Sequence, residues 1–257
     1  TFLLEKGNEL GGLASLISKI PAKNRLADFP HYLMHRAEQL DNLYIFKNTE
    51  GTPENIRKFH PNIIVSSTGS APLLPPIAGL KDRIDNEKHN IYSILGMISH
   101  INDFPKDLEG KKVVVVGGGA VGLDVVEFFA DRNADISIVE MMDQIGRDLD
   151  PVSKNDTKTM MKKHNVHQLT KTALLEVKDS SFLVRGDGEP YELPFEYGFV
   201  CLGMRAQGQL YQNLTEEFSS EDVEIMNIGD SQRARRIIDG TQEGRNILTI
   251  LEQKGYL

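Results

Sequence analysis

A run of β-branched residues that leads directly into a glycine-rich turn constrains the fold more than any other part of this chain. Residues 112–116 read Lys-Val-Val-Val-Val, and residues 117–122 read Gly-Gly-Gly-Ala-Val-Gly. A strand and turn of this kind can hold a dinucleotide, because each glycine has a separate role. Gly117 allows a sharp turn, Gly119 lets the backbone approach a pyrophosphate, and Gly122 lets the following helix pack closely on the sheet.

The next residues complete the pattern of a dinucleotide-binding unit. A helix predicted over about 120–133 would direct its first amides at the phosphates. The next apolar strand, at 135–139, ends on Glu140, which can accept hydrogen bonds from an adenosine ribose and would repel a 2′-phosphate. The unit therefore favours NAD(H) over NADP(H). Its candidate cofactor residues are Gly117, Gly118, Gly119, Val121, Gly122 and Glu140.

Length and composition indicate a globular protein with more than one domain. The chain has 257 residues, of which 40% are hydrophobic, and its net charge of −8 argues against a nucleic-acid partner. No apolar run approaches the ~20 residues of a membrane helix, so we expect a cytoplasmic protein without a membrane partner. Cys201 is the one cysteine, which leaves no dithiol or iron–sulfur ligand set in this sequence, and we predict that it lies in the core.

Four further apolar segments end on glycine or polar residues that suit a cofactor site. These segments lie at 2–4, 63–65, 197–202 and 223–228. The first mirrors the strand before Glu140, because it also ends on a glutamate. The candidate residues that follow the four segments are Glu5, Lys6, Gly11, Gly12, Thr68, Gly69, Gly203, Gly229 and Asp230. Between the glycine turn and the segment at 197–202, residues 173–193 are predicted to form a small antiparallel meander, since three short apolar runs there are separated by turn residues.

In their order along the chain, these segments resemble the C-terminal half of a flavoprotein family. The family contains 2,4-dienoyl-CoA reductase, trimethylamine dehydrogenase and related NADH:flavin oxidoreductases, with a pyridine nucleotide-disulfide oxidoreductase-like fold. The most specific likeness is Ile228-Gly229-Asp230 followed by Arg235-Arg236-Ile237 and Glu243-Gly244.

The resemblance implies an α/β protein with two Rossmann-like, doubly wound lobes. The FAD lobe would be discontinuous, over 1–100 and 208–257, and the NAD(P) lobe would be inserted at 101–207 and carry the meander. In this scheme the strands at 2–5 and 223–228 lie in one sheet. Glu5 would hold the FAD ribose, and Gly11-Gly12 and Thr68-Gly69 would lie beside the cofactor. Asp230 would bind the ribityl chain or present the adjacent amides to the pyrophosphate.

The resemblance also implies that the sequence is part of a longer protein. The family's first strand and glycine loop of the FAD lobe would precede Thr1, so we expect an N-terminally truncated portion that holds FAD weakly, while the parent protein binds FAD. In longer members, electrons pass from NADH to FAD and then to an iron–sulfur cluster and an FMN in a barrel domain. That barrel domain would be the main partner, and no catalytic acid or base is expected within this sequence.

Several alternatives stay open at this point. The chain could be a dinucleotide-binding module without turnover, or part of a simpler two-domain NADH oxidase or ferredoxin reductase. Glu5 could be a solvated strand end, Thr68-Gly69 an ordinary turn, and Asp230 a helix cap. Arg235 and Arg236 could be surface charges or could contact a partner domain. We interpret Met141-Met142 as packing residues, and we expect no metal site, since His164 and His167 lack further ligands.

Overall fold

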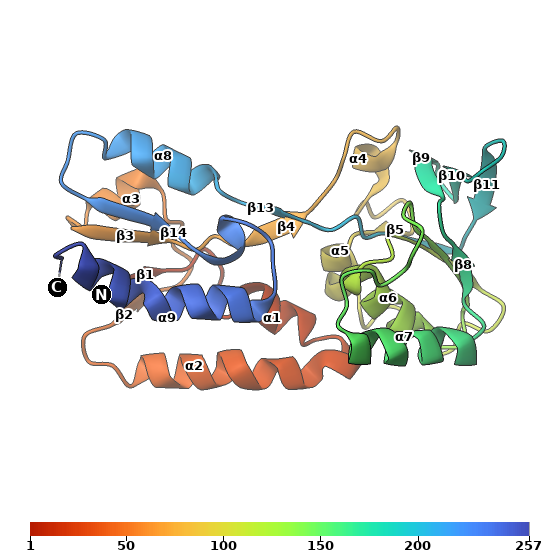
Figure 1. The fold of residues 1–257 in the computed structure, drawn as a ribbon, viewed down its shortest axis with the longest axis horizontal. Helices are drawn as coiled ribbons and strands as arrows, with labels where there is room; N and C mark the ends of the chain where they lie inside the picture. Colours follow the sequence, from red (N-terminus) through yellow and green to blue (C-terminus); the bar gives the residue numbers. More distant parts are fainter. Residues whose placement is uncertain (257) are drawn as a thin grey trace. The chain divides into compact units, whose positions relative to one another are not determined.

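The computed structural model describes residues 1–256, which divide into two compact units (Figure 1). Unit 1 contains residues 1–19, 23–71 and those from 204 onward, and unit 2 contains residues 20–22 and 72–203. The predicted fold class is confirmed, because parallel α/β sheets and an antiparallel meander are both present. The predicted boundaries are shifted, since residues 72–100 belong to unit 2 and residues 204–207 to unit 1.

Unit 2 is built on a five-stranded parallel sheet. Its strand order is β5-β12-β6-β7-β8, with β6 in the centre. The boundary prediction was wrong at residue 100 because β5, a two-residue strand without a clear sequence pattern, pairs with β12 and so ties its segment to this sheet. The strands are β5 (Ile91–Tyr92), β6 (Lys112–Val116), β7 (Asp135–Val139), β8 (His167–Leu169) and β12 (Tyr197–Val200).

Both faces of this sheet are covered, which explains the unbroken valine run of β6. Val113 and Val115 are fully buried, and α6 (Ala120–Ala130) packs on β6, β7 and β12. Val114 and Val116 belong to the core cluster that includes apolar residues of the meander. The meander is antiparallel, as predicted, with the order β11-β10-β9. Its strands are β9 (Ala173–Val177), β10 (Ser181–Arg185) and β11 (Tyr191–Pro194).

The strands of unit 1 form short parallel ladders. β1 (Phe2–Leu4) pairs with β2 (Tyr44–Phe46), and β3 (Ile63–Ser66) pairs with β14 (Glu224–Asn227). Within residues 1–256 the segments at 2–5 and 223–228 therefore lie in two separate ladders, contrary to the prediction that one sheet contains both. The physical reason is that β1 and β3 each pair along one edge only, and among residues 1–256 no strand joins the two ladders. A third pair, β4 (Ser70–Pro72) with β13 (Met204–Ala206), completes the set.

Local sequence signals set the helix boundaries. Thr52 caps α3 (Pro53–Arg57) by accepting a 3.2 Å hydrogen bond from the Asn55 amide. Asp150 caps α7 (Pro151–Lys163) in the same way, through the amides of the second and third helical residues. The remaining helices are α1 (Gly12–Ile17), η1 (Pro21–Ala27), α2 (Asp28–Glu38), α4 (Leu80–Arg83), α5 (Ile94–Ser99), α8 (Gln209–Glu217), η2 (Gly229–Ser231) and α9 (Ile237–Gln253).

No helix within residues 1–256 combines the length and the apolar character needed to cross a membrane.

The contact between β12 and the meander yields a stability prediction. A Cβ atom at Gly198 would lie 2.7 Å from the ring ends of both Phe182 and Phe195, whereas a Cβ atom at Gly188, in the β10–β11 turn, would meet no atom within 4 Å. We expect Gly198→Ala to lower the free energy of unfolding by roughly 1–3 kcal/mol, because two buried rings must shift. Gly188→Ala is the matched control, and equal denaturation midpoints for the two variants would contradict the packing described.

Candidate functional site

The glycine turn of unit 2 is held by close backbone contacts. Gly117 has φ of 109°, and a Cβ atom there would lie 2.1 Å from the Cys201 carbonyl oxygen. A Cβ atom at Gly122 would lie 1.9 Å from the Gly117 carbonyl oxygen. These contacts allow α6 to begin directly against the end of β6. Gly119 differs, because a Cβ atom there would meet no atom within 4 Å, so the backbone at this position borders open space.

Glu140 lies against the glycine turn. Its Oε2 accepts a 2.7 Å hydrogen bond from the Gly118 amide, and its Oε1 accepts a 2.7 Å bond from the Met142 amide. A carboxylate oxygen has two lone pairs, so each oxygen keeps the capacity to accept one more donor, such as a ribose hydroxyl. The carboxylate is therefore fixed in place by the backbone and still able to bind a ligand.

The other candidates of unit 2 occupy the same edge of the sheet. Gly203 follows the carboxyl end of β12, and a Cβ atom there would meet no atom within 4 Å. Val121 is half-buried in the first turn of α6. Since parallel strands place their carboxyl ends at one edge, these residues and the glycine turn share the edge where open α/β sheets bind ligands.

Cys201 takes no part in a reactive centre. The thiol is buried, as predicted, and burial raises the pKa of Cys201 to about 12. A thiol with so high a pKa remains protonated at neutral pH and is inert as a nucleophile.

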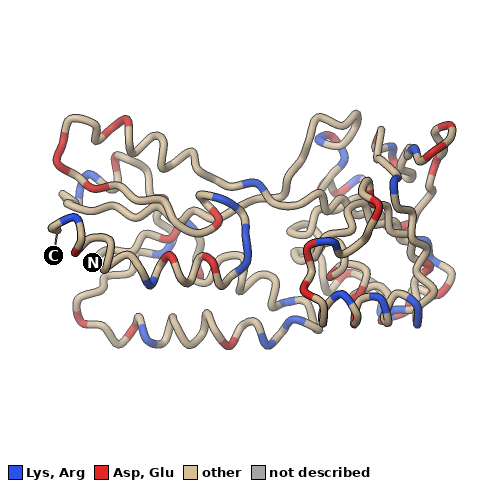
Figure 2. The backbone as a smooth tube through the Cα atoms, viewed as in Figure 1, with Lys and Arg blue, Asp and Glu red and all other residues tan. Residues whose placement is uncertain are grey.

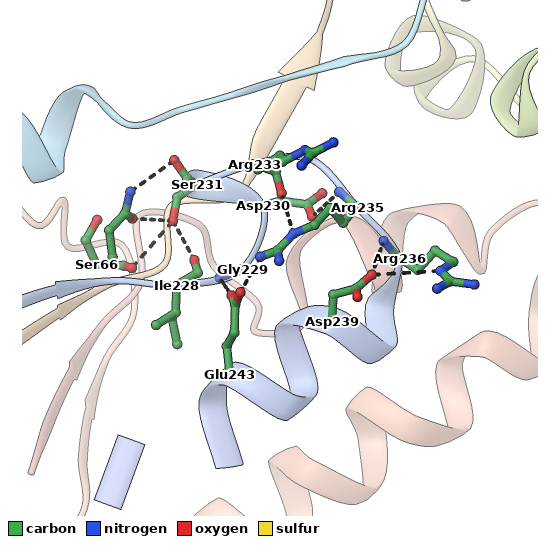
Figure 3. A network of polar contacts seen from close by, with 11 residues as sticks. Ser66, Ile228, Gly229, Asp230, Ser231, Arg233, Arg235, Arg236, Asp239 and Glu243 are labelled. Carbon is green, nitrogen blue, oxygen red and sulfur yellow. Dashed lines mark hydrogen bonds and ion pairs between the residues drawn. The ribbon is translucent and has the colours of Figure 1, made fainter. Parts of the chain in front are cut away.

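In unit 1, Gly229 and Asp230 lie at the centre of a polar network (Figure 3). The Asp230 carboxylate accepts a 2.9 Å bond from the Ser70 hydroxyl and a 3.0 Å bond from the Arg235 amide. The Glu243 carboxylate accepts a 2.6 Å bond from the Gly229 amide and is paired with the Arg235 guanidinium. The network fixes the turn between β14 and α9 from both sides.

The two arginines before α9 have different surroundings. Figure 2 shows a basic stretch between η2 and α9, with acidic residues on either side of it along the chain. The Arg235 side chain is 27% exposed and forms an ion pair with Glu243, so it is not an unpaired surface charge. Arg236 is 83% exposed and lies 3.8 Å from the Asp239 carboxylate. Among the described polar atoms, the buried Ser66 hydroxyl next to this network has no hydrogen-bond partner.

The remaining candidates of unit 1 are brought into ordered turns. Glu5 Oε1 accepts a 2.6 Å bond from the amide two residues ahead, at Gly7, which repeats the bond from Met142 to Glu140. Lys6 forms an exposed ion pair with Glu50. Gly11 and Gly12 lie at the start of α1. Thr68 and Gly69 are both bound to Gln207. The Thr68 hydroxyl donates a 2.5 Å bond to the Gln207 carbonyl, and the Gln207 amide donates a 2.9 Å bond to the Gly69 carbonyl.

Sequence reasoning gave no role to Ser70 or Glu243, although both hold the Gly229-Asp230 turn. Ser70 lies 160 residues before Asp230, and Glu243 lies 14 residues after Gly229. No local pattern connects residues at such separations. The spacing of Glu243 from Gly229 was part of the family likeness, and that was its one available signal.

The contacts of Glu243 with the Gly229 amide and the Arg235 guanidinium yield a pH-dependent prediction. The Arg235 guanidinium, followed by the Gly229 amide, lowers the pKa of the Glu243 carboxyl from its usual value. A carboxyl with a lowered folded pKa stabilises the fold above its unfolded pKa, and this contribution is lost as the pH falls through the folded pKa. We expect Glu243→Gln to cost about 1 kcal/mol of unfolding free energy at pH 7, and less as the pH falls below about 4.

Glu252→Gln is the control for this measurement, because Glu252 is an exposed glutamate on the same helix. Urea denaturation of both variants and the wild type at several pH values would check the prediction. A Glu243→Gln effect that did not change between pH 7 and pH 3 would contradict it.

Comparison with known proteins places this geometry in a family. The sequence profile of the pyridine nucleotide-disulphide oxidoreductase family matches residues 34–226. An NADH oxidase of Thermoanaerobacter brockii is 25% identical over 243 residues, which cover 94% of this chain and 36% of that protein.

Two solved structures are similar over nearly the whole chain. A 2-naphthoyl-CoA reductase complex has a TM-score of 0.79 at 22% identity, covering 95% of this chain and 35% of the other. Histamine dehydrogenase from Rhizobium sp. 4-9 has a TM-score of 0.78 at 15% identity, covering 96% and 38%. These structures show the fold, and the chain spans little more than a third of their length.

The resemblance stated from the sequence is thus confirmed. FAD and NAD(H) are the cofactors that the family and its reductase relatives imply. The matched profile covers more than half of the sequence. The chain belongs to the pyridine nucleotide-disulphide oxidoreductase family, a family of NAD(P)H-dependent flavoprotein oxidoreductases.

Proposed function

We propose that unit 2 binds NAD(H) at the glycine turn and Glu140. The observation that carries this proposal is the fixed Glu140 carboxylate beside Gly118, together with the open space at Gly119. A pyrophosphate can approach the backbone at Gly119 and meet the first amides of α6. The ribose hydroxyls can then reach the free lone pairs of Glu140. Gly117, Gly122, Val121 and Gly203 would shape the same edge without donating to the ligand.

We further propose that unit 1 is the FAD-binding unit. Its supporting residues are Glu5, Lys6, Gly11, Gly12, Thr68, Gly69, Gly229 and Asp230, all of which lie within this unit. The Glu5 carboxylate has one oxygen bound by the Gly7 amide, so the other is available to a ribose hydroxyl. Asp230 is held rigidly by Ser70 and Arg235, which suits a residue that positions a polyol chain.

Strand order supports an additional strand in unit 1, contributed by residues outside 1–257. In unit 2, the glycine-turn strand β6 lies between β12 and β7, and Glu140 directly follows β7. In unit 1, Glu5 directly follows β1, which pairs with β2 as β7 pairs with β8. The edge of β1 that corresponds to the β6 side pairs with no strand among residues 1–256, and the same holds for one edge of β3. We propose that a glycine-turn strand fits between β1 and β3.

The exposed apolar side chains of unit 1 agree with such an addition. Phe2 on β1 is 48% exposed, and Tyr44, Phe46 and Val65 on the neighbouring strands are also exposed. Parallel sheets in α/β proteins are normally covered on both faces. A strand followed by a helix would cover these side chains.

As part of a longer protein, the chain would form the electron-input portion of an NADH-dependent flavin oxidoreductase. The chemistry that its cofactors supply is hydride transfer from NADH to FAD. The relatives named above are nearly three times as long as the matched segment, which leaves room for a barrel domain with its own FMN and iron–sulfur cluster. The parent would be a reductase of the dienoyl-CoA or enoate type, and the organic substrate would bind in that domain.

A module without turnover is the second candidate, because the proposed strand between β1 and β3 belongs to the FAD site. Residues 1–257 would then bind NADH but hold little FAD. The experiment is an absorbance spectrum of the purified chain together with NADH calorimetry. We expect a nearly colourless protein that binds NADH. A stoichiometric flavin spectrum would contradict the proposal of an additional strand between β1 and β3, and the absence of NADH binding would contradict the assignment of unit 2.

Alanine substitutions at two glycines of the turn should affect NADH binding and folding stability separately. We expect Gly119→Ala to change the free energy of unfolding by less than about 1 kcal/mol, because its Cβ atom enters open space. The same methyl group would keep a pyrophosphate from the backbone and weaken NADH binding roughly tenfold. Gly122→Ala is the contrasting variant, since its Cβ atom collides with the Gly117 carbonyl and should destabilise the fold. Unchanged NADH affinity in Gly119→Ala would argue against this site.

Glu140 should determine the choice between NADH and NADPH. Removing its charge in Glu140→Ala ends the repulsion of a 2′-phosphate, so the affinity ratio of NADPH to NADH should rise roughly tenfold. Asp143→Ala is the control, because Asp143 is an exposed acid three residues away. Calorimetry with both nucleotides measures the ratio. Equal affinities in the wild-type chain would show that Glu140 does not discriminate.

A further inference from the structure

A cavity of unit 2 lies at the edge of the parallel sheet opposite to the glycine turn. Its volume is about 310 Å³, and it is lined by the loop before β5, the residue before β6, the β9–β10 turn and the start of β12. Parallel strands place their amino ends at one edge of a sheet, whereas the glycine turn lies at the carboxyl edge. The volume is at the lower end of the range for small-molecule sites. This cavity is therefore a candidate site separate from the proposed NAD(H) site.

The acidic groups that line the cavity are already bound by the protein. Asp179 Oδ1 accepts a 2.7 Å hydrogen bond from the Arg83 guanidinium and lies 3.8 Å from His89 Nδ1. Glu196 Oε2 accepts a 2.7 Å hydrogen bond from the Lys112 amide. These contacts occupy both carboxylates, so neither is an open site for a cationic ligand.

The two lysines of the cavity wall have no such partners. Within residues 1–256, the ammonium groups of Lys88 and Lys111 form neither an ion pair nor a hydrogen bond. The same cavity is lined by the buried Phe195 and by the half-buried Tyr197, whose ring stacks on that of Phe129. Ammonium groups form their strongest hydrogen bonds with anionic acceptors. The cavity thus combines two unpaired positive charges with an aromatic wall.

We propose that this cavity binds a small organic acid. The carboxylate of the acid would lie at the ammonium groups of Lys88 and Lys111, and its apolar body would lie against Phe195 and Tyr197. The methylene groups of the two lysine side chains would add to the apolar wall. This inference goes beyond the proposed function, because it requires no dinucleotide.

The acid would bind away from the redox chemistry and not as its substrate. β6 has five residues and extends from the cavity, at Lys111, to the glycine turn, at Gly117. A strand rises about 3.3 Å per residue, so roughly 16 Å separate the cavity from the turn. Hydride transfer requires reacting atoms about 3–3.5 Å apart. An acid in the cavity and NAD(H) at the turn would therefore be bound at the same time without contact.

The first test compares probes that share one ring and differ in charge. In an NMR titration of the wild-type chain, benzoate should bind at millimolar concentration and shift the amide resonances of Lys111, Ser180 and Tyr197. Neutral benzamide and cationic benzylamine should bind at least roughly fivefold more weakly, because neither carries a negative charge for the lysines. Benzamide binding as tight as that of benzoate would overturn the proposal. Inorganic phosphate binding as tight as that of benzoate would show an adventitious anion only, and would also overturn it.

The second test removes the charges one sign at a time. Lys88→Ala/Lys111→Ala should weaken benzoate binding roughly tenfold. Lys106→Ala is the matched control, because Lys106 is an exposed lysine of unit 2 outside the cavity. Glu196→Gln keeps an oxygen acceptor for the Lys112 amide and removes one negative charge, so it should strengthen benzoate binding roughly twofold to threefold.

Thermal melts and NADH calorimetry on the same variants keep this test separate from the proposed function. All variants alter exposed side chains far from the glycine turn, so the melting temperature and the NADH affinity should not change. Full benzoate affinity in the double lysine variant would overturn the organic-acid site alone. A wild-type chain that bound benzoate but not NADH would instead contradict the NAD(H) site and leave the organic-acid site supported.

Discussion

The close approach of α6 to the end of β6 is the constraint on which the rest of unit 2 depends. Gly122 lies against the Gly117 carbonyl, and Gly117 lies against the Cys201 carbonyl, so one helix and two strands meet with no room for a side chain. This crowding fixes the turn, and the Gly118 amide then donates to the Glu140 carboxylate. The carboxyl ends of β6, β7 and β12 lie at one edge of the sheet.

The two units use carboxylates in a related way. Glu5 and Glu140 each follow a strand and accept the amide two residues ahead, but Glu140 also binds an amide of the glycine turn. In unit 1 the corresponding fixed turn is at Gly229, whose amide is held by Glu243. In both units, a backbone amide of a glycine turn is thus held by a carboxylate from another segment. If these turns bind the proposed cofactors, this order lowers the entropy lost on binding.

The sequence was sufficient to predict the features that depend on neighbouring residues. The central strand β6, the glycine turn after it and the meander all follow from local patterns, because dihedral preferences and apolar periodicity act over short separations. Pairings between distant segments could not be predicted. Which segments meet in space determines the pairing of the two-residue strand β5 and the separation of β1 from β14. It also determines the bond from the Gly229 amide to Glu243. Met141 and Met142, which we interpreted as packing residues, are exposed. An apolar side chain is buried only where another element covers it.

The unpaired edges in unit 1 have a consequence for how the chain behaves in solution. Thr1 and Glu5 direct their backbone groups to β2, so Phe2 and Leu4, which alternate with them, direct theirs away from it. The amides and carbonyls of such an edge can pair with the same edge of another molecule. Aggregation of residues 1–257 should therefore increase with protein concentration. It should begin at β1 and β3 while unit 2 remains folded.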